Sequence, residues 1–213
     1  MKLCMVRHGE TAWNAEGRVQ GQLDVPLSDT GHAQARAVAQ ALAGESFDVL
    51  YSSDLVRVQQ TARPLASLLG KSPILDARLR ERHYGIFQGM TYAQAREELS
   101  EDFLRFRNKD PDYDFQTGES LRAFSARVLQ FMQDLLEKEK GRSVLVFTHG
   151  GVLEILYRHA TSRGLSTPRD FEIPNAALNR FEHGAGAWQI HCWADVAHLA
   201  SLVDEALDDL PDG

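Results

Sequence analysis

The sequence predicts an α/β fold, a three-layer α/β/α sandwich whose central sheet is mostly parallel and contains one antiparallel strand. Strand-like apolar runs alternate with helix-like amphipathic runs along most of the 213 residues, which is typical of a parallel sheet flanked by helices. The last two strand-like runs are joined by glycines at 184 and 186, which indicates an antiparallel hairpin. Because 43% of the residues are hydrophobic, the chain can bury a sizeable core, and we expect a single domain over residues 1–213.

The individual elements follow from the periodicity of apolar residues. We expect strands at residues 3–6, 47–51, 73–75, 143–147, 177–182 and 187–193. We expect helices at about residues 28–42, 55–69, 120–140 and 152–160. Ser28 and Ser120 are the expected N-caps of the first and third helices. Either Ser53 or Asp54 should cap the second, and Pro64 should kink or break it, because proline removes a backbone donor and clashes with the preceding turn.

Two segments lack this regular periodicity. Residues 84–118 carry many charges and Asp-Pro punctuation, and we interpret them as an irregular helical insertion that covers one end of the sheet. Such an insertion is the natural place for substrate specificity. Residues 204–213 are acidic and predict a loose tail.

Composition excludes several classes of partner. A formal charge of -7 and a pI of about 5.6 argue against nucleic acid or an anionic membrane as the main partner, because those require clustered lysine and arginine. Cys4 and Cys192 lie far apart in the sequence and are typical of reduced cysteines. The apolar run after Lys2 is too short for a signal peptide or a membrane span. We therefore expect a cytoplasmic protein, either a monomer or a homodimer that pairs through the hairpin edge.

Four charged or ionisable residues lie at strand ends or at the start of a helix. Arg7 and His8 end the first expected strand, and His149 ends the strand that begins at Ser143. Arg57 lies in the first turn of the helix after the second strand. Because the carboxyl ends of parallel strands share one edge of a sheet, these side chains should converge. Two planar guanidinium groups beside helix amides can bind the oxygens of a phosphoryl group.

Small and neutral residues complete this predicted phosphate pocket. Gly9, Gly150 and Gly151 allow the backbone to approach a ligand closely. Asn14 can add a neutral donor from the loop after the first strand.

The same residues suggest catalytic roles. Positive charge near His8 disfavours its protonated form, so that one ring nitrogen can act as a nucleophile near neutral pH. Glu81 can protonate the leaving oxygen from a partly buried position and then act as the base for water. His149 can stabilise charge in the transition state by donating a hydrogen bond. A single histidine at a strand end is often only structural, so the hypothesis depends on the whole group.

A metal or nucleotide site is not predicted. His8 and His149 have arginine neighbours that would repel a divalent cation, so we expect no metal. The chain contains neither a Gly-x-Gly-x-x-Gly nor a Walker-type loop, and we expect no cofactor.

Taken together, these motifs resemble the histidine phosphatase superfamily, branch 1, over nearly the whole chain. The motifs that carry the resemblance are Val6-Arg7-His8-Gly9-Glu10-Thr11 with Trp13-Asn14, Leu27-Ser28 with Gly31 and Gln34-Ala35, Tyr51-Ser52-Ser53-Asp54-Leu55 with Arg57, Gln60-Thr61-Ala62, Leu79-Arg80-Glu81 with Gly85 and Gly89, and Thr148-His149-Gly150-Gly151. The resemblance implies a phosphoglycerate mutase-like fold and a reaction without metal. It implies that His8 is phosphorylated, with Glu81 as proton donor, and that Arg7, Arg57 and His149 form the phosphate pocket. Further candidate substrate-binding residues are Asn14, Gln20, Gly21, Arg82, His83, Tyr84 and Gly150.

Three activities are compatible with this resemblance. Residues 81–85 with 88–89 are similar to cofactor-dependent phosphoglycerate mutases, whereas residues 117–120 resemble the phosphatases. The segment after Arg107 lacks the Arg-Arg pair and the proline-rich stretch with which those mutases hold the second charged end of the substrate, so we favour a phosphatase. A non-catalytic binder of phosphorylated ligands should lack the nucleophile or the acid, and both are present.

The expected substrate is a small phosphorylated metabolite. Six residues could line the entrance and favour acidic metabolites, and they are Arg82, His83, Tyr84, Arg105, Arg107 and Lys109. The last three could equally be solvated charges on an inserted helix.

Overall fold

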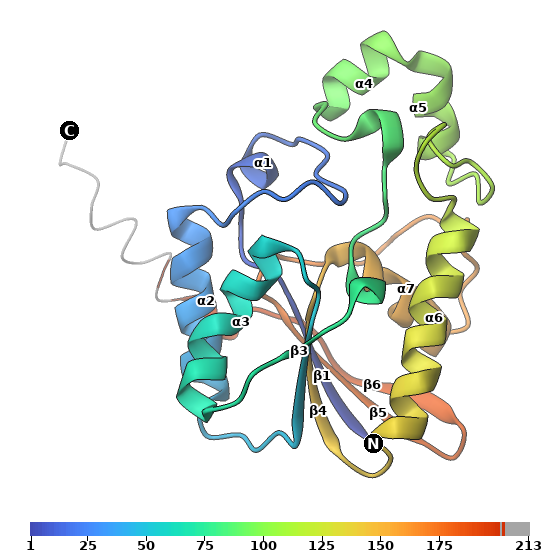
Figure 1. The fold of residues 1–213 in the computed structure, drawn as a ribbon. Helices are drawn as coiled ribbons and strands as arrows, with labels where there is room; N and C mark the ends of the chain where they lie inside the picture. The colour runs from blue at the N-terminus through green and yellow to red at the C-terminus, as the bar shows by residue number, and fades with distance from the viewer. Residues whose placement is uncertain (201, 203–213) are drawn as a thin grey trace, which may run out of the picture.

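A computed structural model describes residues 1–200 and 202, and its centre is a six-stranded sheet (Figure 1). The strand order is β3-β2-β4-β1-β5-β6. The strands are β1 (Lys2–Arg7), β2 (Val49–Ser52), β3 (Ile74–Leu75), β4 (Ser143–Thr148), β5 (Leu178–Gly184) and β6 (Ala187–Asp195). The pairs β3–β2, β2–β4 and β4–β1 are parallel, and β5 pairs antiparallel with both β1 and β6. The predicted mostly parallel sheet with one antiparallel strand is therefore confirmed.

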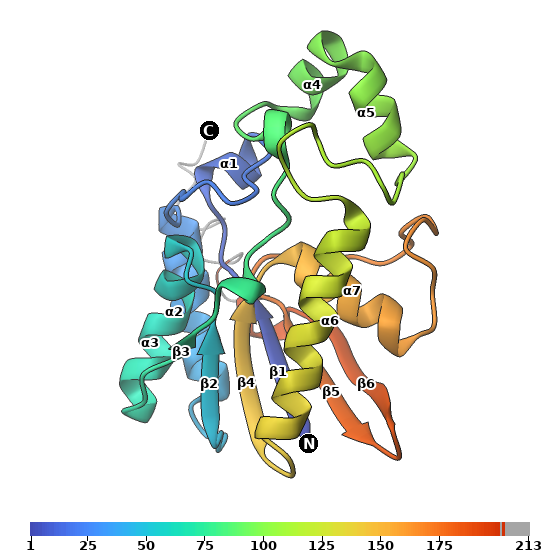
Figure 2. The same cartoon turned by 45° about the vertical axis from the view of Figure 1, so that its right-hand side comes forward.

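Helices cover both faces of the sheet. The helices are α1 (Ala12–Ala15), α2 (Asp29–Leu42), α3 (Val56–Leu69), α4 (Tyr92–Glu98), α5 (Ser100–Arg107), α6 (Leu121–Lys138) and α7 (Gly150–Ala160). Helices α2 and α3 lie on one face, and α6 and α7 on the other (Figure 2). Among the described residues, none of these helices combines the length and apolar character needed to cross a lipid bilayer.

Strand β1 shows why the sheet is buried on both faces. Leu3 and Met5 belong to the apolar cluster under α6 and α7, whereas Cys4 and Val6 belong to the cluster under α2 and α3. Successive side chains of a strand point to opposite faces, so a continuous apolar run fills both cores. Cys4 and Cys192 are both free.

Helix α3 differs from the prediction at its start and at its centre. Its N-cap is Leu55, which makes no side-chain capping bond, and the amide of Val56 instead donates to Asp24 Oδ1 at 2.6 Å. The helix also continues through Pro64 to Leu69 without a break. We attribute this continuity to its buried apolar face, which packs on the sheet strongly enough to offset the lost backbone bond.

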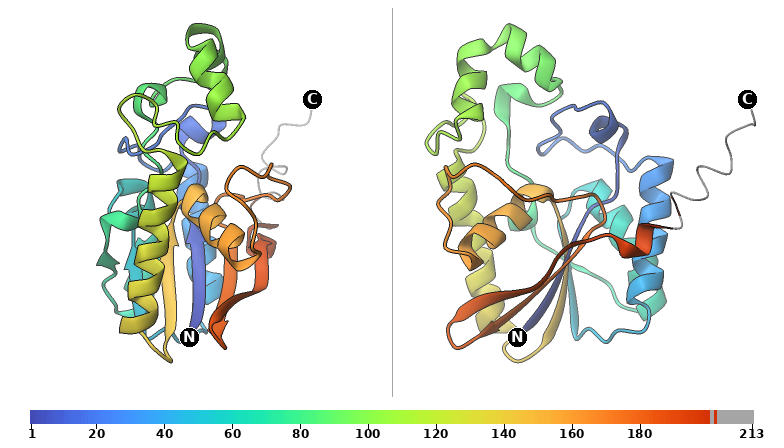
Figure 3. Two further views of the ribbon diagram at one scale, coloured as in Figure 1. Left: turned by 90° about the vertical axis from the view of Figure 1, so that its right-hand side faces the viewer. Right: turned by 180° about the vertical axis from the view of Figure 1, so that it is seen from behind.

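Residues 84–118 stand beyond the carboxyl ends of the parallel strands, as all views show (Figure 3). They contain the 3₁₀ turn Gly85–Phe87 and helices α4 and α5. They also contribute most of a separate cluster of buried apolar residues, which consists of Val19, Phe87, Ala95, Phe103, Tyr113 and Phe115. This segment therefore packs largely on itself. The predicted tail at 204–213 lies outside the described residues.

Candidate active site

The four predicted phosphate-site residues meet at the carboxyl edge of the sheet. Arg7 ends β1, and the amide of His8 donates to Thr148 O on the neighbouring β4 at 2.9 Å. His149 follows β4 as the N-cap of α7, and its ring lies 5.2 Å from the ring of His8 between centroids. Arg57 reaches the same point from the first turn of α3, where its Nη2 lies 3.2 Å from His149 Nδ1. Three distant parts of the chain thus form one group, in which His8, Arg57 and His149 are buried and Arg7 is half-buried.

His8 is oriented for attack by its Nε2 atom. Its Nδ1 lies 2.7 Å from Gly9 O, and because a carbonyl oxygen only accepts, Nδ1 carries the proton. Nε2 therefore has a free lone pair. Burial lowers the pKa of His8 well below its ordinary value of 6.5, and the positive charges of Arg57 and Arg7 lower it further. The neutral, nucleophilic ring is the stable form.

Backbone contacts fix the turn that carries this histidine. Asn175 Nδ2 and the amide of Ala176 donate to His8 O at 3.0 and 3.2 Å. A Cβ atom on Gly9 would lie 2.6 Å from Gly31 O, and a Cβ on Gly31 would lie 2.0 Å from a backbone oxygen. The two glycines are therefore required by this close approach of two backbone segments.

His149 has a partner at each ring nitrogen. Its Nδ1 faces the guanidinium of Arg57, which can only donate, so the proton lies on Nε2, 2.9 Å from Ser53 Oγ. Burial is the main cause of the lowered pKa of His149, and Arg57 is the next. For His149 to donate a hydrogen bond from Nδ1 to a phosphoryl oxygen, its proton must move from Nε2 to Nδ1. The Ser53 hydroxyl is compatible with both forms of the ring, because it can accept a hydrogen bond from Nε2 or donate one to it.

The arginines are held by backbone carbonyls. Arg57 donates to Leu23 O and Gly21 O at 2.9 and 2.7 Å, so Gly21 contributes to the site through the placement of Arg57. Arg7 Nη1 donates to Ile173 O. A Cβ on Gly150 would lie 3.5 Å from Arg7 Nε, which places this glycine directly against the guanidinium.

Asn14 lies in the short helix α1 rather than in the predicted loop, and Gln20 lies in the loop that follows this helix. Asn14 Oδ1 accepts from the amide of Thr11 at 3.1 Å, which fixes the side-chain amide and leaves its NH₂ group for a ligand. Gln20 Oε1 is buried and has no hydrogen-bond partner within the described part of the chain. Both positions suit contacts with a bound anion or its organic part.

Glu81 is placed by two backbone amides. Its Oε1 accepts from Arg82 N at 2.8 Å, and its Oε2 accepts from Gly151 N at 3.0 Å. A Cβ on Gly151 would lie 2.1 Å from Glu81 Oε1, so glycine is needed to make room for the carboxylate.

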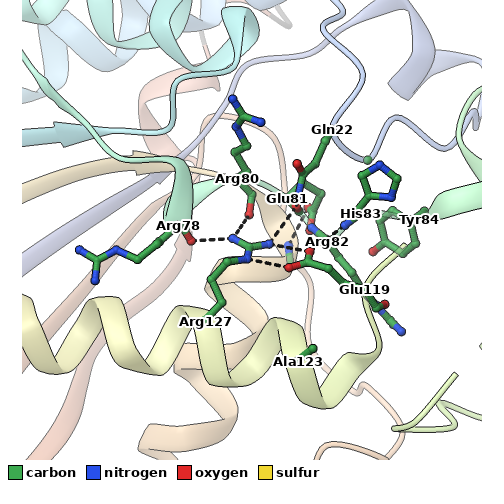
Figure 4. A network of polar contacts seen from close by, with 12 residues as sticks. Gln22, Arg78, Arg80, Glu81, Arg82, His83, Tyr84, Glu119, Ala123 and Arg127 are labelled. Atoms are coloured by element: carbon green, nitrogen blue, oxygen red, sulfur yellow. Dashed lines mark hydrogen bonds and ion pairs between the residues drawn. The ribbon is translucent and has the colours of Figure 1, made fainter. Parts of the chain in front are cut away.

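Arg127 of α6 supports the segment that ends in Glu81 (Figure 4). Its Nη1 donates to Arg78 O and Arg80 O at 2.7 and 3.0 Å, and its Nη2 to Glu81 O at 3.3 Å. The same guanidinium forms a two-point ion pair with Glu119, at 2.8 and 2.7 Å. Sequence analysis missed this support because no local pattern links α6 with residues 78–81.

Some predicted substrate residues have partners within the protein. Arg82 is buried, and its guanidinium donates to Glu119 O and Tyr113 O at 2.9 and 2.8 Å. His83 Nδ1 lies 3.2 Å from the amide of Gly85, which donates to it. Arg105 pairs with Asp110 at 2.8 Å, away from the site.

A cavity of about 470 Å³ is lined in part by Gly151, whose amide donates to Glu81 Oε2. Its lining consists of Arg82, Tyr84, Tyr92, Phe106, Arg107, Lys109, Leu121, Phe124, Gly151, Glu154, Ile155 and Arg169. Arg107 and Lys109 are among the predicted entrance residues, whereas Arg169 is not. It comes from the loop after α7, which has no motif or periodicity that could have indicated this role.

Within the described residues, no group of three or more histidine, cysteine, aspartate or glutamate side chains could hold a metal ion. The charges that face His8 are instead those of arginines. Such a site attracts an anion and disfavours a divalent cation.

Comparisons with known proteins agree with this geometry. The family described as "Histidine phosphatase superfamily (branch 1)" matches residues 3–196. "Phosphoglycerate mutase-like protein 4" of Arabidopsis thaliana is 41% identical, over 93% of this chain and 86% of that protein. "Metal-independent phosphoserine phosphatase" of the same plant is 35% identical, over 94% of this chain and 84% of that protein. A solved mycobacterial glucosyl-3-phosphoglycerate phosphatase in complex with VO3 is 32% identical and superposes with a TM-score of 0.82, covering 91% of this chain and 98% of that one.

Proposed function

The chain belongs to the histidine phosphatase superfamily, branch 1, and we propose that it hydrolyses a small phosphomonoester through a phosphohistidine formed on His8. The observation that carries the proposal is the free lone pair of His8 Nε2 among Arg7, Arg57 and His149. Phosphatases among the relatives support the hydrolytic outcome.

The first step transfers the phosphoryl group to the enzyme. Arg7 and Arg57 bind the non-bridging oxygens and orient the phosphorus in line with His8 Nε2. The N–P bond forms as the bond from phosphorus to the ester oxygen breaks, and protonated Glu81 gives its proton to that oxygen. The alcohol then leaves.

The second step returns the histidine to its free form. Glu81, now a carboxylate, accepts a proton from a water molecule whose oxygen attacks the phosphorus. The N–P bond breaks, and inorganic phosphate is released. His149 and the arginines stabilise the charge on the phosphoryl oxygens in both steps.

The physiological setting is part of the same proposal. Relatives named for phosphoserine and for glucosyl-3-phosphoglycerate support a small phosphorylated metabolite as substrate. Two free cysteines, one of them buried, fit the reducing cytoplasm.

The test is release of inorganic phosphate from a panel of phosphomonoesters in excess EDTA. We expect turnover by the wild type and by His191→Ala, a histidine variant on the exposed face of β6, but not by His8→Ala. Acid-labile, base-stable label should appear on the wild-type protein after incubation with radiolabelled substrate, and not on His8→Ala.

Two outcomes would contradict the proposal. Isomerisation of 3-phosphoglycerate that requires a bisphosphoglycerate primer and releases no net phosphate would identify a mutase. Ligand binding without phosphorylation or turnover, unchanged in His8→Ala, would identify a non-catalytic binder.

A further inference from the structure

We propose that Thr61 is a positioning residue, whose hydroxyl holds the turn of His8 against the helix that carries Arg57. This inference rests on the proposed function, because it concerns the placement of the proposed nucleophile. Thr61 belongs to the motif Gln60-Thr61-Ala62 and lies one helical turn after Arg57 on the buried face of α3. Its side chain is fully buried, so its hydrogen bonds must be made within the protein.

The hydroxyl of Thr61 has two partners that fix its orientation. Its Oγ1 accepts from the amide of Gly9 at 2.9 Å and donates to Arg57 O at 2.7 Å. An amide can only donate and a carbonyl can only accept, so the hydroxyl proton points to Arg57. Among the residues that the structure describes, Thr61 is the only hydrogen-bond partner of the Gly9 amide. One side chain therefore joins the turn after β1 to the first turn of α3.

The turn of His8 needs this restraint because Gly9 supplies none. Glycine is required at this position by the close approach to Gly31, but a glycine leaves its own backbone free to rotate. The carbonyl side of the peptide between His8 and Gly9 is held by Asn175 Nδ2, which donates to His8 O at 3.0 Å. Thr61 holds the amide side of the same peptide. The plane of this peptide is therefore fixed at both of its edges.

The position of that peptide decides how the His8 ring is held. Gly9 O accepts from His8 Nδ1 at 2.7 Å, and this contact leaves Nε2 without a proton. Rotation of the peptide would displace Gly9 O, so that the ring could turn or move its proton to Nε2. Attack on phosphorus requires a well-aligned lone pair, and small misplacements slow such a step strongly. Loss of the Thr61 hydroxyl should therefore slow phosphoryl transfer to His8.

Binding of the phosphate group should depend less on Thr61. The Arg57 guanidinium is held by Leu23 O and Gly21 O, and neither contact involves Thr61. A threonine bonded to the carbonyl four residues earlier in a helix can also have a purely structural role. A structural role predicts that binding and turnover are lost together. Positioning of His8 predicts instead that phosphoryl transfer is slowed while the phosphate pocket stays intact.

The experiment removes the hydroxyl while keeping the shape of the side chain. Thr61→Val does this, Thr61→Ser keeps the hydroxyl, and Thr61→Cys is a second variant with a weakly hydrogen-bonding thiol. Thr161→Val is the matched control, because Thr161 Oγ1 also donates to the carbonyl four residues earlier, Tyr157 O, at 2.8 Å, but is exposed. We would measure turnover of p-nitrophenyl phosphate, the rate of phosphoenzyme formation after rapid mixing, and inhibition by inorganic phosphate. NMR chemical shifts of the His8 ring nitrogens, assigned by comparison with His8→Asn, report the tautomer.

We expect Thr61→Val to lower the rate of phosphoenzyme formation and the specificity constant, kcat/KM, by about 10- to 100-fold. The inhibition constant of phosphate should change by no more than about threefold, because the arginines stay in place. Thr61→Ser should recover most of the rate, Thr61→Cys should be intermediate, and Thr161→Val should match the wild type. The His8 ring should be a single tautomer in the wild type and a mixture of both in Thr61→Val.

The possible failures can be told apart. If the wild type neither releases phosphate nor forms a phosphoenzyme, the proposed function itself fails. If the wild type reacts and Thr61→Val reacts at the same rate, the function stands and the positioning role of Thr61 is wrong. If Thr61→Val loses phosphate binding and turnover alike while the His8 tautomer is unchanged, the role of Thr61 is structural and the inference is again overturned. If Thr61→Val does not fold, Thr61→Cys decides by the same measurements.

Discussion

Protonation of single buried residues links the active site to stability. The pKa of His8 and that of His149 both lie well below 6.5, chiefly because of burial and then because of the neighbouring arginines. In the unfolded chain these histidines take up protons near their ordinary pKa, whereas in the folded protein they stay neutral. Below that pH the unfolded state binds more protons, so the free energy of unfolding must fall as the solution becomes acidic.

We therefore expect His8→Asn to lose less stability on acidification than the wild type. When the pH falls from about 7 to about 5, one histidine that stays neutral in the folded protein lowers the free energy of unfolding by about 1 to 2 kcal/mol. The wild type should lose that much more than His8→Asn over this interval. Urea unfolding at several pH values in phosphate-free buffer measures the difference, with His191→Asn as control. Parallel pH curves for wild type and His8→Asn would contradict the assignment.

At this scale, sequence reasoning predicted which residues meet but not how each is bonded. Arg7 ends a strand of the parallel sheet, and His8 and His149 each follow one, so their convergence depends only on topology. The proton position on each ring depends instead on Gly9 O and on the Arg57 guanidinium in the folded protein. Arginine side chains are usually exposed, but that of Arg82 is buried and donates to a backbone carbonyl group. No local sequence pattern indicates this burial.

Among the elements, α6 bears on catalysis through one side chain. Arg127 binds the carbonyl groups of residues 78, 80 and 81, so it fixes the backbone that carries Glu81. A residue that positions the general acid should matter most when the leaving group needs protonation.

We expect Arg127→Met to lower kcat with alkyl phosphates by about 10- to 100-fold, which is less than the roughly 10²- to 10⁴-fold contribution of general acid catalysis because Glu81 itself remains. The loss with p-nitrophenyl phosphate, whose leaving group needs little protonation, should be several times smaller. Arg122→Met is the control, because Arg122 lies on the same helix and pairs with exposed Asp112. Equal losses with both kinds of substrate would indicate a purely structural role.

The prediction of helices and strands succeeded where the spacing of apolar residues determines the element. It failed where a residue from a distant segment contacts the end of an element. The apolar spacing of α6 and α7 predicted both helices and their position beside the sheet. The predicted N-cap of α3 was wrong, because the acceptor for Val56 N is Asp24. This residue lies in the loop after α1, more than thirty positions earlier in the sequence. Asp54, one predicted cap, is instead paired with Arg80 at 2.6 Å.

At the scale of the whole molecule, an acidic protein holds a locally positive site. The chain has a formal charge of -7, yet Arg7, Arg57, Arg107 and Arg169 face the phosphate pocket or its adjoining cavity. The positive charge at the site attracts an anionic substrate, whereas the negative net charge of the molecule repels it. Salt screens both the attraction and the repulsion.

We expect added salt to lower kcat/KM more for the more highly charged substrate. From about 0.02 to about 0.5 M NaCl the Debye length shrinks several-fold. Over that range the specificity constant should fall several-fold with 3-phosphoglycerate as substrate, and it should fall less with p-nitrophenyl phosphate. Steady-state rates at constant pH, with potassium chloride as a second salt, measure this. An equal fall in kcat/KM with both substrates would show that the positive charge at the site does not favour the more highly charged substrate.

The separate aromatic cluster in residues 84–118 has an evolutionary consequence. Because that segment packs mostly on its own apolar residues, its sequence can drift or be replaced without disturbing the sheet edge that holds His8, provided that its hydrogen bonds to residues 17–22 are kept. The backbone contacts around Gly9 and Gly31, by contrast, tolerate almost no change. Grafting residues 84–118 from a relative with another substrate should therefore be a practical route to redesign selectivity while the reaction stays the same.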